Sequence, residues 1–193
     1  IEKEPAKYTY WSVIAGCTST VPVLILYDPF FDTLNNLTQN PSILYFADEM
    51  YAPFAEEICK LSFLAILLSI IRREADSLID FIIYSAAIAI GFEFIENILY
   101  QWAQLEEVQP FKAWLFELDG RTIGGIGSHL IYSVWNGVAI WTLLSFRGIR
   151  SLIISLLLVS VGITLHSINN FSVTMSQYGP PDEILAINHL GNI

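Results

Sequence analysis

Long apolar runs recur along this chain, and their length is the feature that most constrains its fold. A helix needs about 20 mainly apolar residues to cross a bilayer. Five candidate spans lie at about residues 10–27, 54–71, 78–100, 122–146 and 151–171. Of the 193 residues, 54% are hydrophobic and only 15% are charged, whereas soluble domains hold about 25% charged residues. The sequence therefore predicts an all-α, polytopic membrane helical bundle, with residues 1–193 forming one domain.

The segments between these runs are polar or rich in helix-breaking residues. Residues 28–53 are rich in Pro, Asn and Asp and are expected to form a loop with an interfacial turn or two. Pro53 is expected to open the second span, because Pro suits the first position of a helix. Residues 172–193 are expected to form a polar tail. The chain starts with Ile1 rather than Met, which indicates a mature or partial chain.

Charge and cysteine content exclude two classes of protein. The net charge is −10, and without a basic patch to neutralise phosphates nucleic-acid binding is not expected. Cys17 and Cys59 do not make a disulfide framework. Both lie in apolar runs, where we expect them to be small buried hydrophobic side chains.

The distribution of Lys and Arg predicts the orientation in the membrane. With five spans, one side carries Lys3, Lys7, Arg72, Arg73, Arg147 and Arg150. The other side carries Lys112 and Arg121 among acidic residues. The first side is therefore expected to be cytoplasmic, in the plasma membrane or an equivalent one. The loops at 28–53 and 101–121 and the C-terminal tail are expected to lie outside.

Every predicted span after the first carries ionisable or amide side chains near its outer end. They are Glu56, Glu57 and Lys60, then Glu93, Glu96 and Asn97, then His129 and Ser133, and finally His166 and Asn170. A charged side chain at the bilayer centre costs about 2.5–3.5 kcal/mol on insertion scales, so such residues usually face the bundle interior and mark function. Because four helices place these groups at one depth, the sequence predicts a single cluster.

Such a cluster of carboxylates and imidazoles is suited to two kinds of chemistry. In the first, the side chains would bind a divalent metal. In the second, one carboxylate would activate a water while His and Asn stabilise an oxyanion. Helical spacing supports shared faces, because Glu56 and Lys60, like His166 and Asn170, are four residues apart.

Each group taken singly also has a structural explanation. Acids at a helix start are favoured by the helix dipole, and polar pairs within spans can join helices by hydrogen bonds. Their common depth is what favours a functional interpretation. Two further residues are given structural roles, His189 as a solvated surface residue and Arg121 as an interfacial anchor.

Residues 52–171 resemble the PrsW family of intramembrane proteases, which belongs to a superfamily with the type II CAAX prenyl endopeptidases and the bacteriocin-immunity Abi proteins. The resemblance rests on Pro53-x-x-Glu56-Glu57-x-x-Lys60, Phe92-x-x-x-Glu96-Asn97, Arg121 with His129-x-x-x-Ser133-x-x-x-Gly137, and His166-x-x-x-Asn170. Glu96, where the CAAX enzymes carry His, and Lys60, where they carry Arg, favour the PrsW branch.

The resemblance implies a membrane-embedded endopeptidase. The catalytic set that it implies is Glu56, Glu57, Lys60, Glu96, His129, His166 and Asn170. Glu56 would activate the water, and Lys60 would hold Glu57. The implied metal ligands are Glu57, Glu96, His129 and His166, with zinc as the expected ion. The residues are equally compatible with a glutamate-activated water and no metal.

The resemblance also implies partners. Bacterial members resemble site-1 proteases that cleave an anti-sigma factor outside the membrane, so the expected partners are membrane lipid and a single-span substrate of this kind. Assembly with other membrane proteins is compatible with the sequence.

Two rival classes of function remain. A non-catalytic subunit would be favoured by a missing motif residue, and none of the core set is missing. A carrier or proton relay would be favoured by repeats or broken helices, for which "GGIG" at residues 124–127 is the only hint.

Overall fold

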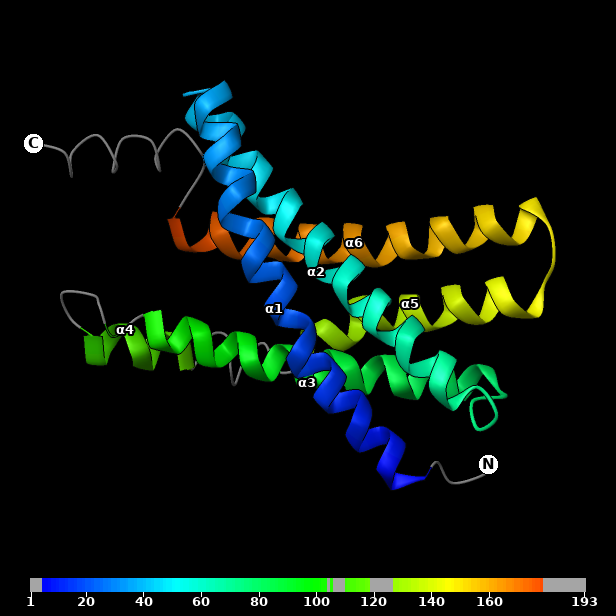
Figure 1. The fold of residues 1–193 in the computed structure, drawn as a ribbon. Coiled ribbons are helices and arrows are strands. Elements are labelled where there is room, and N and C mark those ends of the chain that lie inside the picture. The colour runs from blue at the N-terminus through cyan, green and yellow to red at the C-terminus, as the bar shows by residue number, and fades with distance from the viewer. Residues whose placement is uncertain (1–4, 104, 106–109, 119–126, 179–193) are drawn as a thin grey trace, which may run out of the picture.

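The computed structural model describes residues 5–103, 105, 110–118 and 127–178, and within them the chain forms helices and no strands. The helices are α1 (Ala6–Leu37), α2 (Pro41–Ile71), α3 (Leu78–Ala103), α4 (Pro110–Glu117), α5 (Ser128–Ser145) and α6 (Ile149–Tyr178). Helices α3, α5 and α6 run roughly along one direction, and α1 and α2 cross them obliquely (Figure 1). The predicted all-helical bundle is confirmed.

Within the described residues, three helices are long and apolar enough to cross a membrane. They are Ala6–Leu37, Leu78–Ala103 and Ile149–Met175. Helices α2 and α5 occupy the predicted second and fourth spans and carry many of the charged and polar groups. The multi-pass membrane bundle is therefore confirmed, while five as the number of spans stays a prediction.

The prediction of a loop over residues 28–53 is wrong. Helix α1 continues to Leu37 and α2 begins at Pro41, so only residues 38–40 connect them. Pro53 lies inside α2 rather than at its start. The two helices form a hairpin that extends to the upper left of Figure 1.

Side-chain contacts between α1 and α2 explain why this segment is helical. The Tyr27 hydroxyl donates to Asp48 Oδ1 at 2.5 Å. The rings of Phe30 and Tyr51 stack, with centroids 3.6 Å apart and planes within 3°. Packing of this kind overrides the low helix propensity of a segment rich in Pro, Asn and Asp.

Other boundaries also differ from the predictions. Helix α6 continues to Tyr178, so the first residues of the predicted polar tail are helical. The short helix α4 lies within the predicted acidic loop at 101–121. The start of the predicted fourth span, at residues 122–126, lies outside the described residues.

Glycines allow the helix backbones to approach closely at three crossings. A Cβ on Gly16 of α1 would collide with the Ile88 carbonyl of α3, and one on Gly91 of α3 would collide with the Val13 carbonyl of α1. The glycines at positions 137 and 162 meet carbonyls of α3 and α5 in the same way. Small residues at such crossings are typical of membrane bundles, where helices associate mainly by close packing.

Hydroxyl groups join the same helices across these crossings. The Ser85 hydroxyl of α3 donates to the Ser133 carbonyl of α5. The Ser155 hydroxyl of α6 donates to the Ala139 carbonyl of α5 at 2.8 Å. These bonds, with the glycine contacts, hold α5 between α3 and α6.

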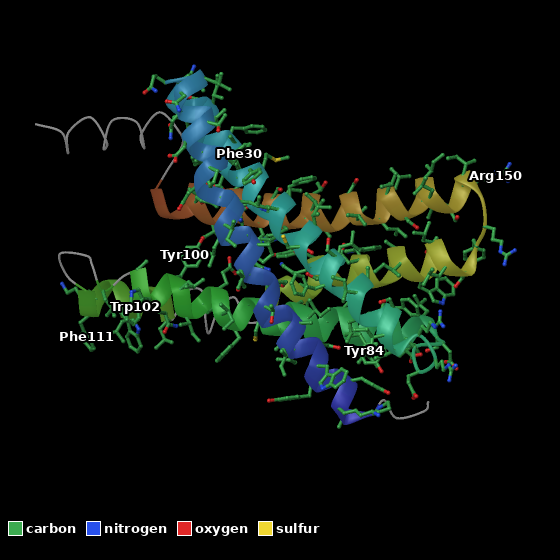
Figure 2. All side chains as sticks on the ribbon, in the orientation of Figure 1. Phe30, Tyr84, Tyr100, Trp102, Phe111 and Arg150 are labelled. Atoms are coloured by element: carbon green, nitrogen blue, oxygen red, sulfur yellow. The ribbon has the colours of Figure 1, made fainter. Side chains whose placement is uncertain are left out.

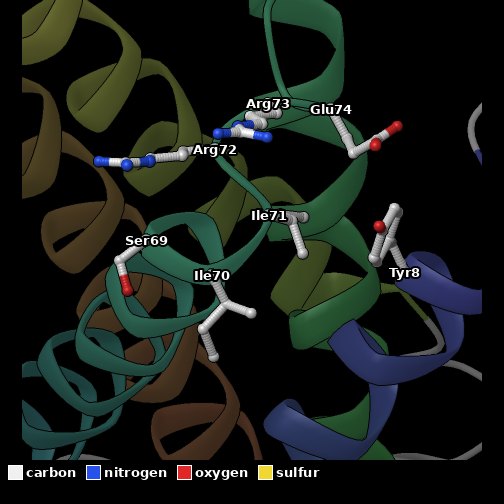
Figure 3. Close-up of a pocket in the computed structure, with 7 residues that line it drawn as sticks. All are labelled: Tyr8, Ser69, Ile70, Ile71, Arg72, Arg73 and Glu74. Carbon is white, nitrogen blue, oxygen red and sulfur yellow. The ribbon is translucent and has the colours of Figure 1, made fainter.

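The connections α2–α3 and α5–α6 lie at one end of the bundle, which we call the connection end. Arg150 marks this end in Figure 2, and Trp102 and Phe111 lie at the opposite end. A cavity of about 450 Å³ opens at the connection end between Tyr8 of α1 and the segment Ser69–Glu74 (Figure 3). Arg72 and Arg73 line this cavity together with Glu74, and Arg147 and Arg150 lie at the α5–α6 connection, so arginines gather at the connection end.

An apolar core fills the bundle between the connection end and the polar cluster. Its buried residues are Leu64, Leu67, Leu68 and Ile71 of α2, Ala75, and Phe81, Tyr84 and Ile88 of α3. Cys17 and Cys59 are free, and they are half-buried rather than buried as predicted.

The crossing of α1 and α3 gives a test of the packing. Replacing Gly91→Ala should lower the free energy of unfolding in detergent by about 1–3 kcal/mol, because the methyl group forces the backbones apart. The measurement is the thermal unfolding midpoint. Ile90→Ala is the control, because Ile90 is 48% exposed on the neighbouring face of α3. Equal midpoints for the two variants would contradict the close crossing.

Candidate active site

Four helices bring the predicted polar residues together inside the bundle. Glu56, Glu57 and Lys60 lie on α2, Glu96 on α3, His129 on α5 and His166 on α6. Glu56, Glu96, His129 and His166 lie about 15–18 residues from the connection end of their helices, which is about 22–27 Å at 1.5 Å per residue. Glu57 and Lys60 lie closer to that end of α2.

Polar residues of all four helices therefore lie at a similar distance from the connection end, as predicted. The helix ends, however, are not where they were expected. Glu56 and Glu57 do not open their helix, because α2 begins at Pro41. The helix-dipole explanation for these two acids is wrong for that reason, since the dipole acts mainly within the first turn.

Glu57 is fully buried and accepts hydrogen bonds at both carboxylate oxygens. Oε1 accepts from Lys60 Nζ at 2.7 Å and contacts His166 Nδ1 at 3.2 Å. Oε2 accepts from Ser133 Oγ at 2.9 Å and from Asn136 Nδ2 at 3.0 Å. Because a carboxylate offers about four acceptor positions, Glu57 is saturated by its neighbours and ties α2 to α5 and α6.

Lys60 supplies the positive charge of the cluster and is only 1% exposed. Its ammonium lies 2.7 Å from Glu57 Oε1 and 3.6 Å from Glu56 Oε2. It also lies 4.1 Å from the centroid of the Phe92 ring. A buried charge is tolerated when it is paired in this way. Lys60 thus contacts Glu57 as the resemblance implies, while its role in catalysis stays a prediction.

The contacts of His129 determine where its ring proton lies. Nδ1 is 2.9 Å from Lys60 Nζ. An ammonium has three donors and no acceptor, so Nδ1 must accept. The proton of the neutral ring is then on Nε2, which lies 2.8 Å from Glu96 Oε2.

The same reasoning assigns the ring proton of His166. Nδ1 faces the acceptor Glu57 Oε1 and therefore carries the proton, which leaves the lone pair on Nε2. That nitrogen lies 3.7 Å from Glu56 Oε2. The Tyr132 ring stacks on the His166 ring at a centroid distance of 4.7 Å and fixes its plane.

Three acceptor atoms consequently converge. Glu56, His129 and His166 are all buried, and each offers one ligand atom within 4.8 Å of the others. The other nitrogen of each imidazole faces a carboxylate, Glu96 for His129 and Glu57 for His166. Carboxylates in this position are typical of histidines that bind metals, because they fix the tautomer and the ring orientation.

The geometry differs from the expected ligand set. Glu57 and Glu96 were expected to bind the metal with the two histidines, whereas the structure groups Glu56 with them. Glu57 and Glu96 instead contact the nitrogens that point away from the shared space. The donor set of two imidazoles and one carboxylate fits zinc, which is commonly bound by such a set at catalytic sites.

Some predicted residues lie beside the cluster rather than in it. Asn170 is half-buried one turn beyond His166, and among the described residues no hydrogen bond joins its side chain to the cluster. Its catalytic role stays a prediction. Arg121 and His189 lie outside the described residues.

Two residues have roles that the sequence reasoning did not assign. Asn136 donates to Glu57, and its spacing of seven from His129 could have placed it on the same helix face. Glu93 Oε1 accepts from the Gly127 N–H at 2.9 Å. Gly127 is the N-cap of α5 and adopts a φ of 80°, which favours glycine. Glu93 thus fixes the start of the helix that carries His129.

Comparison with protein families identifies one match. A family model described as PrsW family intramembrane metalloprotease matches residues 4–187, nearly the whole chain. Comparison with curated proteins and with solved structures finds no significant match.

The hydrogen bonds of Glu57 can be tested through Asn136. Asn136→Leu keeps the side-chain size but removes the donor to Glu57 Oε2, so the free energy of unfolding should fall by about 1–3 kcal/mol. Thermal unfolding in detergent measures the loss. Thr142→Val is the control, because Thr142 Oγ1 donates only to the Val138 carbonyl of its own helix. A loss no larger than that of the control would count against Glu57 as the anchor.

Proposed function

The chain belongs to the PrsW family of intramembrane metalloproteases, and we propose that it is an endopeptidase whose reacting groups are Glu56, His129 and His166. One observation carries this proposal. Two imidazole lone pairs and one carboxylate point into the same buried space, and a carboxylate faces the opposite nitrogen of each ring.

The positions of the ring protons favour a metal-dependent reaction. They do not favour one in which the histidines donate hydrogen bonds to an oxyanion. Neither imidazole presents an N–H toward Glu56 when the protons lie on His129 Nε2 and His166 Nδ1. The three groups would hold zinc, which would supply a Lewis acid for the scissile carbonyl and lower the pKa of a bound water. Glu96 and Glu57 would keep the two rings in the required orientation.

Glu56 is the group best placed to move protons during hydrolysis. Its Oε2 lies between the two imidazoles, 3.9 Å from His129 Nδ1 and 3.7 Å from His166 Nε2. In the proposed reaction one oxygen of Glu56 would hold the metal. The attacking water would lose a proton to the other oxygen of the same carboxylate, which would return it to the amine nitrogen that leaves. Glu57 is unsuited to this role, because its acceptor positions are taken by neighbouring donors.

The arginines at the connection end support a proposal for the side of the membrane on which the site lies. Arg72, Arg73, Arg147 and Arg150 lie at that end of the bundle, and the positive-inside rule would place it in the cytoplasm. The cluster, about 22–27 Å away at 1.5 Å per residue, would then lie toward the extracytoplasmic face. A site there suits cleavage of a single-span membrane protein, such as an anti-sigma factor, at or near the extracytoplasmic face of the membrane.

Helix continuity argues against the carrier alternative. Helices α2, α3 and α6 run without a break past the residues of the cluster, whereas carriers commonly bind substrates at broken helices.

Proteolysis is tested by replacing the proposed acid–base residue. Glu56→Gln should reduce cleavage of a single-span test substrate by about 10²–10⁴-fold, because the carboxamide cannot accept the proton. His166→Ala should cause a similar loss, and the double variant should be hardly worse than either single variant, because the residues act as a unit. The assay follows release of the substrate's outer fragment in membranes.

Glu74→Gln is the control for this experiment, since Glu74 is exposed at the connection end. Cleavage by Glu56→Gln at the parent rate would refute the assigned role. A well-folded parent that cleaves no test substrate would instead favour a non-catalytic subunit with the same fold.

The orientation has its own test. In a background without Cys17 and Cys59, a cysteine at Arg72 or Arg147 should be protected from a membrane-impermeant maleimide added to intact cells. A cysteine at Trp102, which is 69% exposed at the other end, should react. Permeabilised cells provide the control, because all three positions should then react. Labelling of the two arginine positions in intact cells would reverse the proposed topology.

A further inference from the structure

The lone pair on His129 Nδ1 can either accept a hydrogen bond from Lys60 or bind a metal ion. His129 Nδ1 accepts from the Lys60 ammonium at 2.9 Å. The same atom is the nitrogen of His129 nearest Glu56, and the contacts assign the proton of the ring to Nε2. A nitrogen lone pair serves one partner at a time. Lys60 and a metal ion therefore compete for His129.

We infer that Lys60 is an internal cation that excludes the metal from this site until it leaves His129. This inference rests on the proposed function and concerns its regulation. While Lys60 contacts His129, Glu56 and Glu57, it neutralises the acidic cluster in the absence of a metal. When a metal binds, the ammonium keeps its 2.7 Å contact with Glu57 and gives up His129.

The surroundings of Lys60 make both arrangements feasible. Its strongest partner, Glu57, belongs to the same helix, three residues away, so the Lys60–Glu57 pair does not depend on α5. The Phe92 ring, 4.1 Å from the ammonium, supports it by a cation–π contact that does not involve the histidines. Lys60 can thus lose the contact with His129 and remain a paired, buried charge.

Under this inference, removal of Lys60 strengthens metal binding. Removal of a residue that only orients the metal ligands would weaken it. If Lys60 only oriented Glu57, and through it His166, its removal would loosen the site and weaken metal binding, as is usual for residues behind the ligands. If Lys60 competes for the lone pair, its removal frees His129 Nδ1 and leaves a more negative cluster. Metal binding then becomes tighter.

The experiment titrates chelator-treated, detergent-purified protein with Co²⁺ and follows the visible absorption of the bound ion. Lys60→Met, which keeps the length of the side chain but has no charge or donor, should bind Co²⁺ about tenfold more tightly or better. Lys60→Arg keeps the charge and should bind no more tightly than the parent. Lys7→Met, at an exposed position of α1, is the matched control and should bind like the parent.

Thermal unfolding provides a second readout that does not depend on activity. Without metal, Lys60→Met should unfold at a lower temperature than the parent, because Glu57 loses its paired cation. Addition of Co²⁺ should raise its midpoint by more than it raises that of the parent. If Lys60→Met does not fold, Lys60→Gln replaces it, because its neutral amide still donates to Glu57 and should give tighter Co²⁺ binding than the parent.

Equal or weaker Co²⁺ binding by the neutral variants would overturn the inference, and so would a complete lack of Co²⁺ binding by every variant. Neither result would decide the proposed proteolysis. The Glu56→Gln cleavage assay tests that proposal separately, and a metal-free reaction would still require Glu56.

Discussion

The pairing of the Lys60 ammonium with Glu57 is the interaction on which the rest of the site depends. Leaving one member of a buried ion pair unpaired costs about 3–5 kcal/mol, and Lys60 is 1% exposed. Glu57 in turn accepts from Ser133 and Asn136 of α5 and contacts His166 of α6. A single buried carboxylate thereby fixes the relative positions of three helices, which places the imidazoles around Glu56.

Close helix crossings make this convergence possible. In a bilayer, apolar side chains gain little by leaving lipid for protein, so association depends on tight packing and on hydrogen bonds between helices. Gly16 of α1 and Gly137 of α5 both contact the backbone of α3, where a larger side chain would hold the helices apart. Helix α1 contributes no residue to the described cluster, yet its packing on α3 helps to position Glu96.

Much of the site could be predicted from the sequence, because intramembrane charge is rare and helical spacing is regular. Glu56, Lys60, His129 and His166 were predicted to meet, and they do. The hairpin of α1 and α2 could not be predicted, because contacts between distant residues override local helix-breaking signals there. Glu56 rather than Glu57 lies between the two imidazoles, because the oxygens of Glu57 accept hydrogen bonds from other residues. The spacing of residues in the sequence does not reveal these hydrogen bonds.

The depth of the cluster has a consequence for how the membrane voltage acts on it. If the connection end marks one edge of a hydrocarbon core about 30 Å thick, the cluster lies within about 3–8 Å of the other edge at 1.5 Å per residue. An ion that enters from the nearer face crosses about a tenth to a quarter of the potential drop. Of the 2.3 kcal/mol that 100 mV exerts on each elementary charge, only about 0.2–0.6 kcal/mol then applies. For a divalent cation this doubles to about 0.4–1.2 kcal/mol, so a voltage of 100 mV changes the affinity of the site for the metal by less than about tenfold.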